Sequence, residues 1–255
     1  MTNQSEYALE AHGIGRKFVD FWAVKDVDLK VRRGSIHALI GPNGAGKTTC
    51  FNLLTKTLQP SAGRIVLNGE DISHLRTSDV ARRGMVRSFQ ISATFPDMSV
   101  LENVRVALQS GHGAAFRFWN SISSIRGLNA RAMELLGDVG LADAADLSAA
   151  ELSYGKKRAL EIATTLALEP EVMLLDEPTA GMGHEDVEPI TRLIRKVSAG
   201  RTILIVEHNL SVVSTLSDRI TVLQAGQVLM EGSYAEVSAD ERVIAAYMGG
   251  IEDAA

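Results

Sequence analysis

Short apolar runs alternate with amphipathic stretches along most of this chain, which is typical of proteins that pack helices against a mostly parallel sheet. Residues 35–41, 171–177 and 201–208 are compact apolar runs, and each predicts a buried strand. Apolar residues at helical spacing fill 47–58 and, between the second and third strands, 186–199. The pattern predicts an α/β fold with a mostly parallel sheet.

Two regions depart from this alternation of predicted strands and helices. Residues 64–72 turn at Asn68-Gly69 and predict antiparallel β structure in the N-terminal third of the chain. Residues 95–165 have nearly continuous helical spacing around a loop-rich segment at 110–127. Near the end, two strands flank Ala225-Gly226 as a hairpin, and a short helix follows. We therefore expect an N-terminal antiparallel β-subdomain and an inserted α-helical subdomain beside the parallel core.

The composition excludes several classes of protein. The chain has 255 residues, 45% of them hydrophobic, and a net charge of -5, which argues against a general nucleic-acid binder. The single cysteine, Cys50, excludes an internal disulfide and suits a reducing compartment. The N-terminus lacks the pattern of a signal peptide, and the apolar runs are too short to cross a bilayer. A role at a membrane would require a partner.

The segment "GPNGAGKTT" at 41–49 carries the clearest chemistry. It matches G-x-x-x-x-G-K-[ST] between a predicted strand and a predicted helix, which is the context of a phosphate-binding loop. Backbone N–H groups and the helix N-terminus favour phosphate, Lys47 reaches the β and γ phosphates, and the Thr48 hydroxyl holds Mg²⁺. The predicted nucleotide contacts are Gly41, Pro42, Asn43, Gly44, Ala45, Gly46, Lys47, Thr48 and Thr49.

Polar residues follow the two later strands. Asp176 and Glu177 end the first of them, so that one carboxylate is predicted to serve the metal through water and the other to orient or deprotonate water. His208 ends the next strand and is predicted to act on the γ-phosphate. The neighbouring Glu207 has no clear role beyond structure. The sequence predicts that the three groups meet at one sheet edge.

The order and spacing of these motifs resemble the ATP-binding subunits of ABC transporters over nearly the whole chain. "GPNGAGKTT" resembles the Walker A motif and "VMLLDEP" the Walker B motif, His208 fits the H-loop, and Gln90 in "VRSFQ" fits the Q-loop that touches Mg²⁺ and water. "LSYGKKR" at 152–158 resembles the signature motif, usually "LSGGQ". The resemblance implies that Ser153, also a good N-cap, and Gly155 bind the γ-phosphate of ATP held by the opposite subunit. Gly155 would be needed because the nucleotide approaches its backbone closely.

The same resemblance assigns the adenine site and exposes departures from the family pattern. Phe18 falls at the aromatic A-loop position, with Phe21 and Trp22 as rivals and Val24 as a further lining residue. Tyr154 replaces a glycine of the signature and Lys156 replaces its glutamine. The D-loop reads "AGMG" at 180–183, with Gly183 where an aspartate is usual. That change puts in doubt a side-chain contact there and a symmetric coupling of the two ATP sites.

The resemblance also implies an organisation and partners. Residues 1–255 would form one ATP-binding domain, with 1–93 and 165–255 as the ATPase core and β-subdomain, and 94–164 as the helical signature subdomain. ATP and Mg²⁺ are the expected cofactors. The expected partners are permease subunits in the membrane, a second ATP-binding subunit of the same or a different chain, and indirectly a periplasmic solute-binding protein, but no nucleic acid. The expected location is the cytoplasmic face of the inner membrane. Residues 91–100, with Ile91, Phe95 and Met98, are the predicted permease-docking surface.

Three features resemble one subgroup, the ATPase subunits of branched-chain amino acid importers. They are "LSYG" running on as "KKRALEIA", the extra segment at 111–127, and the ending "ADERVIAAYMG". Importers of urea, short-chain amides or aromatic acids remain alternatives, as do a lipopolysaccharide-type exporter and a soluble ABC ATPase of translation or DNA repair. A nucleotide-binding switch without hydrolysis is disfavoured by Glu177 and His208.

Overall fold

The computed structural model describes residues 5–88, 94–111 and 122–252. The chain forms two compact units, which are described separately below. The first unit contains Met1–Met85, Glu171–Glu177 and Ser198–Ala255, and the second contains Val86–Pro170 and Pro178–Val197.

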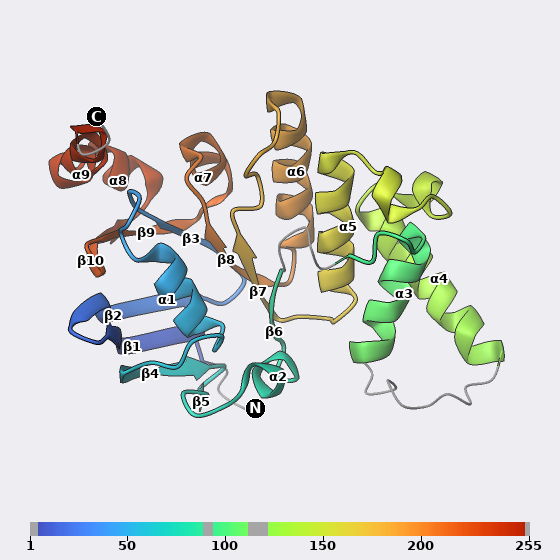
Figure 1. The fold of residues 1–255 in the computed structure, drawn as a ribbon, viewed down its shortest axis with the longest axis horizontal. Helices are drawn as coiled ribbons and strands as arrows, with labels where there is room; N and C mark the ends of the chain where they lie inside the picture. The colour runs from blue at the N-terminus through green and yellow to red at the C-terminus, as the bar shows by residue number, and fades with distance from the viewer. Residues whose placement is uncertain (1–4, 89–93, 112–121, 253–255) are drawn as a thin grey trace. The chain divides into compact units, whose positions relative to one another are not determined.

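Two sheets build the first unit (Figure 1). One is antiparallel, in the order β2 (Phe21–Arg32), β1 (Tyr7–Phe18), β4 (Ala62–Leu67) and β5 (Glu70–Asp71). The other has the order β10 (Gln227–Gly232), β9 (Arg219–Gln224), β3 (Ile36–Ile40), β8 (Thr202–Val206), β7 (Val172–Asp176) and β6 (Met85–Arg87). Strands β9, β3, β8 and β7 run parallel, and β10 closes the edge as an antiparallel hairpin strand. The helices of this unit are α1 (Lys47–Leu54), α2 (Thr77–Ala81), α7 (Leu210–Leu216), α8 (Tyr234–Ala239) and α9 (Glu241–Glu252).

Both predicted hairpin turns are confirmed. Asn68 and Gly69 have φ of 51° and 85°, and Ala225 and Gly226 have φ of 46° and 77°. Positive φ at both central residues is the two-residue turn whose twist matches that of the flanking strands. Every residue of β3 and β8 is buried, as expected for central strands of a sheet covered on both faces.

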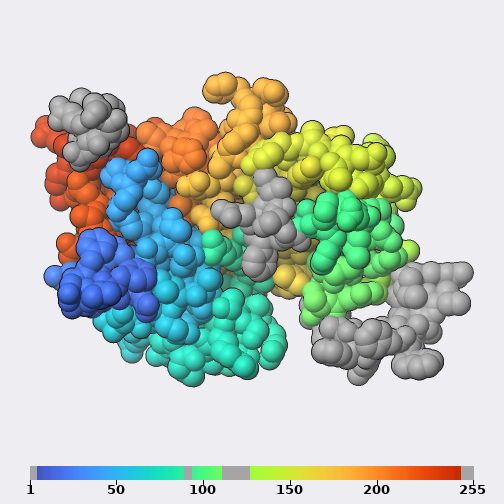
Figure 2. Space-filling view, in the orientation of Figure 1, coloured from blue at the N-terminus to red at the C-terminus, as the bar shows by residue number. Residues whose placement is uncertain are grey.

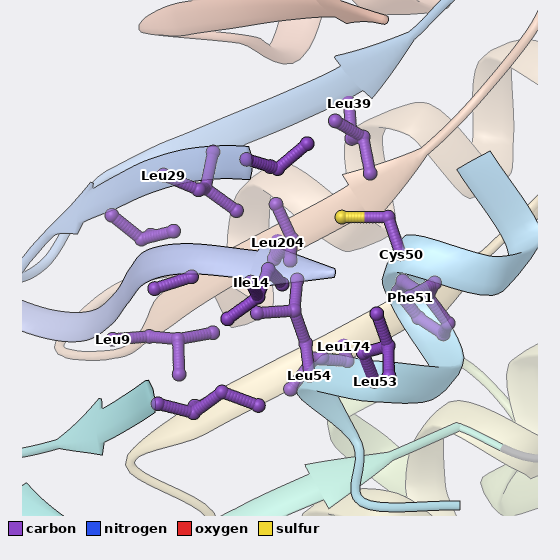
Figure 3. Packing of buried hydrophobic residues seen from close by; sticks show 14 of the residues in the cluster. Leu9, Ile14, Leu29, Leu39, Cys50, Phe51, Leu53, Leu54, Leu174 and Leu204 are labelled. Atoms are coloured by element: carbon purple, nitrogen blue, oxygen red, sulfur yellow. The ribbon is translucent and has the colours of Figure 1, made fainter. Parts of the chain in front are cut away.

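Helix α1 is held in the core of this unit. Figure 3 shows its Phe51, Leu53 and Leu54 packed between side chains of the antiparallel sheet, such as Leu9, and of the parallel sheet, such as Leu174. These side chains are at most 1% exposed, and each large apolar group stabilises the fold by about 1.5–3 kcal/mol. The start of α1, which carries the phosphate-loop lysine, is therefore on a rigid element. In the space-filling view residues 5–85, blue to teal, form one continuous block (Figure 2).

The second unit is helical. It consists of α3 (Val100–Gly111), α4 (Ile122–Asp138), two 3₁₀ turns at Ala142–Ala144 and Ala149–Glu151, α5 (Tyr154–Leu166) and α6 (His184–Val197). Helix α5 packs against α3, α4 and α6, so this unit extends past the predicted helical subdomain of 94–164. The predicted α/β fold class, with an antiparallel β part and an inserted helical part, is confirmed. The subdomain boundaries at 93/94 and 164/165 stay a prediction.

Among the described residues, every helix is too short or too polar to cross a bilayer.

Candidate active site

The loop between β3 and α1 has a backbone conformation that requires a glycine at position 41. Gly41, directly after β3, has φ of 153°, and a Cβ there would come within 2.3 Å of the carbonyl oxygen of Leu223. The loop is fixed to the neighbouring hairpin because the Gly226 N–H donates to the Ala45 carbonyl at 3.0 Å. Helix α1 then begins at Lys47, with no acidic residue in its first turn to offset the positive end of its dipole. The arrangement suits an anion at the loop.

The Lys47 ammonium lies inside this loop. It donates hydrogen bonds to the carbonyl oxygens of Gly41 at 2.7 Å and Pro42 at 2.9 Å. Burial lowers the pKa of Lys47, while the nearby Glu177 carboxylate acts in the opposite direction. The interaction between Lys47 and Glu177 links the predicted Walker A and Walker B segments within the first unit.

The two strand ends β7 and β8 bring the predicted carboxylates and the histidine together. Asp176 pairs in register with Val206, and the Glu177 N–H donates to the Val206 carbonyl at 2.9 Å. The His208 Nδ1 lies 3.8 Å from the Glu177 Oε1, with the two side chains 59% and 44% exposed. Both groups are therefore accessible to a ligand at the edge of the sheet. Glu177 has φ of 44°, and such left-handed strain in a non-glycine residue clusters at functional sites.

Glu207, for which the sequence indicated no clear role beyond structure, has a specific structural role. It is fully buried, and its Oε2 accepts the backbone N–H groups of His208 at 3.0 Å and Asn209 at 3.1 Å. The side chain of Asn209 in turn caps α7 by accepting the Ser211 N–H. Glu207 thus shapes the turn that carries His208. A charged residue at the end of a fully buried strand was the available signal, because such a group is rarely buried without partners.

The predicted adenine platform lies at the end of β1. The Phe18 side chain is 44% exposed and stacks under the Arg16 guanidinium, 4.9 Å from the ring centroid. Phe21 is 69% exposed, whereas the Trp22 ring packs on Gly15, where a Cβ would meet it at 2.8 Å. Val24 has 0% exposure, so any contact with adenine would require it to become accessible. Phe18 remains the predicted stacking residue.

The signature segment lies in the second unit. Ser153 occupies the N-cap position of α5 and is exposed, but its side chain makes no capping hydrogen bond to the described backbone. Gly155 is buried, and a Cβ on it would lie 2.7 Å from Oδ1 of Asp186 on α6. The Asp186 side chain therefore approaches the Gly155 backbone so closely that a larger residue would not fit there. The nucleotide contact expected at Gly155 stays a prediction, and Asp186 is a second reason for a glycine at this position.

The remaining predicted site residues are either outside the described part of the chain or exposed at the phosphate loop. Gln90 and Ile91 lie outside the described residues. Thr48 and Thr49 are the second and third residues of α1, exposed and partly exposed respectively, and the loop residues Pro42, Asn43, Gly44 and Gly46 are partly or fully exposed. Among the described residues, no cluster of three or more His, Cys, Asp or Glu side chains forms a ready-made metal site.

Comparisons with known protein families and sequences agree with this geometry. A family model described as ABC transporter matches residues 24–180, and one described as Branched-chain amino acid ATP-binding cassette transporter matches residues 227–253. The high-affinity branched-chain amino acid transport ATP-binding protein BraF of Pseudomonas aeruginosa is 37% identical over 249 residues, covering 94% of this chain and 97% of that protein. The corresponding LivG of Escherichia coli is 36% identical over 252 residues, covering 96% and 99%.

Solved structures give the same picture. The ADP conformation of MJ1267, an ATP-binding cassette of an ABC transporter, has a TM-score of 0.83 at 27% identity, covering 96% of this chain and 100% of that one. The dimeric structure of MJ0796, a bacterial ABC transporter cassette, has a TM-score of 0.74 at 25% identity, covering 89% and 98%.

Proposed function

Since this chain belongs to the ABC transporter family of ATP-binding proteins, we propose that it hydrolyses ATP to drive the import of branched-chain amino acids through a membrane permease. The observation that carries the substrate class is the match of residues 227–253 to the branched-chain amino acid model. Two relatives named for that transport, BraF and LivG, are similar over nearly their full length. This favours the proposal over urea, amide, aromatic-acid, lipopolysaccharide and non-transport alternatives.

ATP binding is the task of the first unit. The loop 41–49 places backbone and the start of α1 around the phosphates, and Lys47 exchanges its two carbonyl partners for phosphate oxygens. Glu177 orients the attacking water or takes a proton from it, and His208 contacts the γ-phosphate. In this proposal Lys47, Glu177 and His208 act together on the phosphates of one bound ATP.

The donor set at this edge also fits Mg²⁺. The Thr48 hydroxyl is exposed and Asp176 is partly exposed, and both supply the oxygen atoms that this cation prefers. Magnesium binds with few protein groups and completes its shell with water and phosphate, so a larger carboxylate cluster is not needed. When bound, the ion neutralises charge that develops on the β- and γ-phosphates. Thr48 and Asp176 are the residues that would hold it, and Gln90 is assigned a supporting contact.

A second ATP-binding subunit completes the site. The exposed Ser153 hydroxyl and the N-terminus of α5 present a polar, electropositive surface without an internal cap on the serine. This surface would meet the γ-phosphate of ATP on the opposite subunit, in a sandwich of two cassettes. The similar MJ0796 cassette has been solved as a dimer.

A permease would dock on the second unit beside Phe95. This ring is 49% exposed, and Met98 nearby is 37% exposed. Asn103 fixes the loop, because its amide accepts the Phe95 N–H at 2.7 Å and donates to the Phe95 carbonyl at 3.0 Å. A cavity of about 260 Å³ opens next to the ring and leaves room for an inserted side chain; apolar residues such as Val106, Ala107 and Leu168 line it together with polar ones such as Arg87, Asn103 and Thr165. Docking there would place the chain on the cytoplasmic face of the inner membrane, with a periplasmic solute-binding protein delivering substrate to the permease.

Phe95→Asp tests this surface. The charged side chain would have to lose its hydration to enter an apolar contact. We expect the variant to hydrolyse ATP as the free subunit but to recover less permease when a tag on this chain is pulled down from membranes. Val19→Asp is the matched control, since Val19 is 92% exposed and lies in the first unit. Equal permease recovery for Phe95→Asp and the wild type would contradict the docking assignment.

Transport itself is tested by uptake. Cells lacking this chain should lose uptake of radiolabelled leucine, isoleucine and valine, and regain it with the wild type but not with Lys47→Ala. Labelled urea and an aromatic acid serve as comparison substrates. Restored uptake of one of these instead of leucine would refute the substrate class while leaving the ATPase assignment intact.

A further inference from the structure

The first turn of α5 is tied to the loop that follows Glu177. Tyr154, which stands where the family signature usually has glycine, directs its hydroxyl to the carbonyl oxygen of Ala180 and donates a hydrogen bond of 2.8 Å. The same hydroxyl covers Gly181, where an added Cβ would approach it to 3.3 Å. Residues 178–183, here called the D-loop segment, are therefore in contact with the signature helix of their own chain.

A second anchor lies one helical turn further along α5. The Arg158 Nε donates to the Pro178 carbonyl at 3.0 Å, and its guanidinium also binds the Glu161 carboxylate. The Arg158 and Glu161 side chains are only 6% and 2% exposed. Buried charges of this kind hold one geometry, because a departure would leave them without partners. The peptide directly after Glu177 is thus fixed from α5.

These anchors matter because Glu177 is strained. Its φ of 44° is unfavourable for a residue with a side chain, so neighbouring contacts must hold it. On one side, the Glu177 N–H is bonded to the Val206 carbonyl. On the other side, the chain continues into Pro178 and Ala180, whose carbonyls are bonded by Arg158 and Tyr154. Along the chain, the strained residue is therefore followed directly by a segment that is hydrogen-bonded to α5.

We propose that Tyr154 is a positioning residue for ATP hydrolysis, which holds the D-loop segment on the signature helix and thereby keeps the Glu177 carboxylate in its working orientation. The proposal rests on the proposed function, in which Glu177 activates water. It also gives the departure at Tyr154 a role: a glycine there could make no such bond. Since Gly183 offers no side chain, α5 holds this segment through main-chain carbonyls, that of Pro178 by Arg158 and that of Ala180 by Tyr154.

The test uses Tyr154→Phe, which removes only the hydroxyl, in the complete transporter purified through a tag on this chain. We expect kcat for ATP hydrolysis to fall about 2- to 10-fold, the range that one neutral hydrogen bond covers, with KM for ATP unchanged. Amide hydrogen exchange of a peptide covering 178–186 should become several-fold faster, while a peptide covering 41–49 exchanges as in the wild type. Tyr7→Phe is the matched control, since Tyr7 lies on β1 in the first unit and its ring faces Lys30; both readouts should stay as in the wild type.

Each other outcome overturns the proposal. Wild-type kcat would show that the hydroxyl has no part in hydrolysis, and a lower Tm beside it would leave the hydroxyl a role in stability alone. A lower kcat with a raised KM and unchanged exchange at 178–186 would show that Tyr154 contacts the opposite nucleotide instead. Failure of the proposed function is distinguishable, because the wild-type complex would then hydrolyse no ATP while the exchange measurement would still report on the D-loop segment.

Discussion

Replacing the buried Glu207 tests whether the turn carrying His208 is held by a charge. In the native turn one carboxylate oxygen accepts two backbone N–H groups, at 3.0 and 3.1 Å. Hydrogen bonds to a charged group are worth about 1.5–3 kcal/mol each, against about 0.5–1.5 kcal/mol for neutral partners. Glu207→Gln keeps the shape and an acceptor oxygen but loses the charge, so about 1 kcal/mol per bond, or about 2 kcal/mol in total, should be lost.

A loss of that size has measurable consequences. For a chain of this length it corresponds to a fall in Tm of about 4–8 °C. Glu207→Ala should cost more, because it leaves both N–H groups without their acceptor. His208 should also become less well oriented, so kcat for ATP hydrolysis should fall in the order wild type, Gln, Ala, while the affinity for ATP at Lys47 stays unchanged.

Thermal unfolding by circular dichroism and a phosphate-release assay measure these two effects. Glu231→Gln provides a control for removal of a carboxylate, since Glu231 pairs with Arg219 on β9 and is away from the His208 turn in sequence and strand position. If Glu207→Gln retained the Tm and kcat of the wild type, the carboxylate would not be holding the turn.

Three further predictions follow from the same structure. Lys47→Ala removes the ammonium facing the phosphates and should weaken binding of a fluorescent ATP analogue by about 1.5–3 kcal/mol; wild-type affinity would contradict the assignment. Glu177→Gln should bind ATP without hydrolysing it and accumulate a closed dimer in light scattering, with the physiological partner subunit present; adding Ser153→Arg should abolish that dimer, and an undiminished dimer would leave Ser153 as a helix cap only. Burial lowers the pKa of His37 from 6.5 to about 4, so its stabilising effect is complete above pH 6.5 and is lost as pH falls to about 4, for a total of about 3 kcal/mol. His37→Gln should flatten the pH dependence of unfolding in that window, and an unchanged slope would show that other groups cause it.

Local sequence spacing was sufficient for strands β3, β7 and β8 and for the two hairpin turns, but not for the ranges of β1, β2 and β6. Strand β3 and helix α1 are each specified by short apolar patterns, and Gly41 and Lys47 are adjacent to them. Parallel strands end at one edge, so the meeting of Glu177 and His208 could be inferred without coordinates. The strained φ of Glu177 could not, because it depends on Val206, a partner 29 positions away.

The family and the α/β class could be read from the sequence, and the phosphate site could be predicted from it, because those signals lie within windows of about ten residues that propensity and motif spacing describe. The contacts that these residues make came from the folded arrangement. It showed that Asp186 fills the space beside Gly155, that Tyr154 bonds to Ala180, and that Glu207 holds the turn of His208. The physical reason is that a hydrogen bond or a close approach between distant segments depends on packing to within a fraction of an ångström, and the periodicity of neither segment encodes its partner.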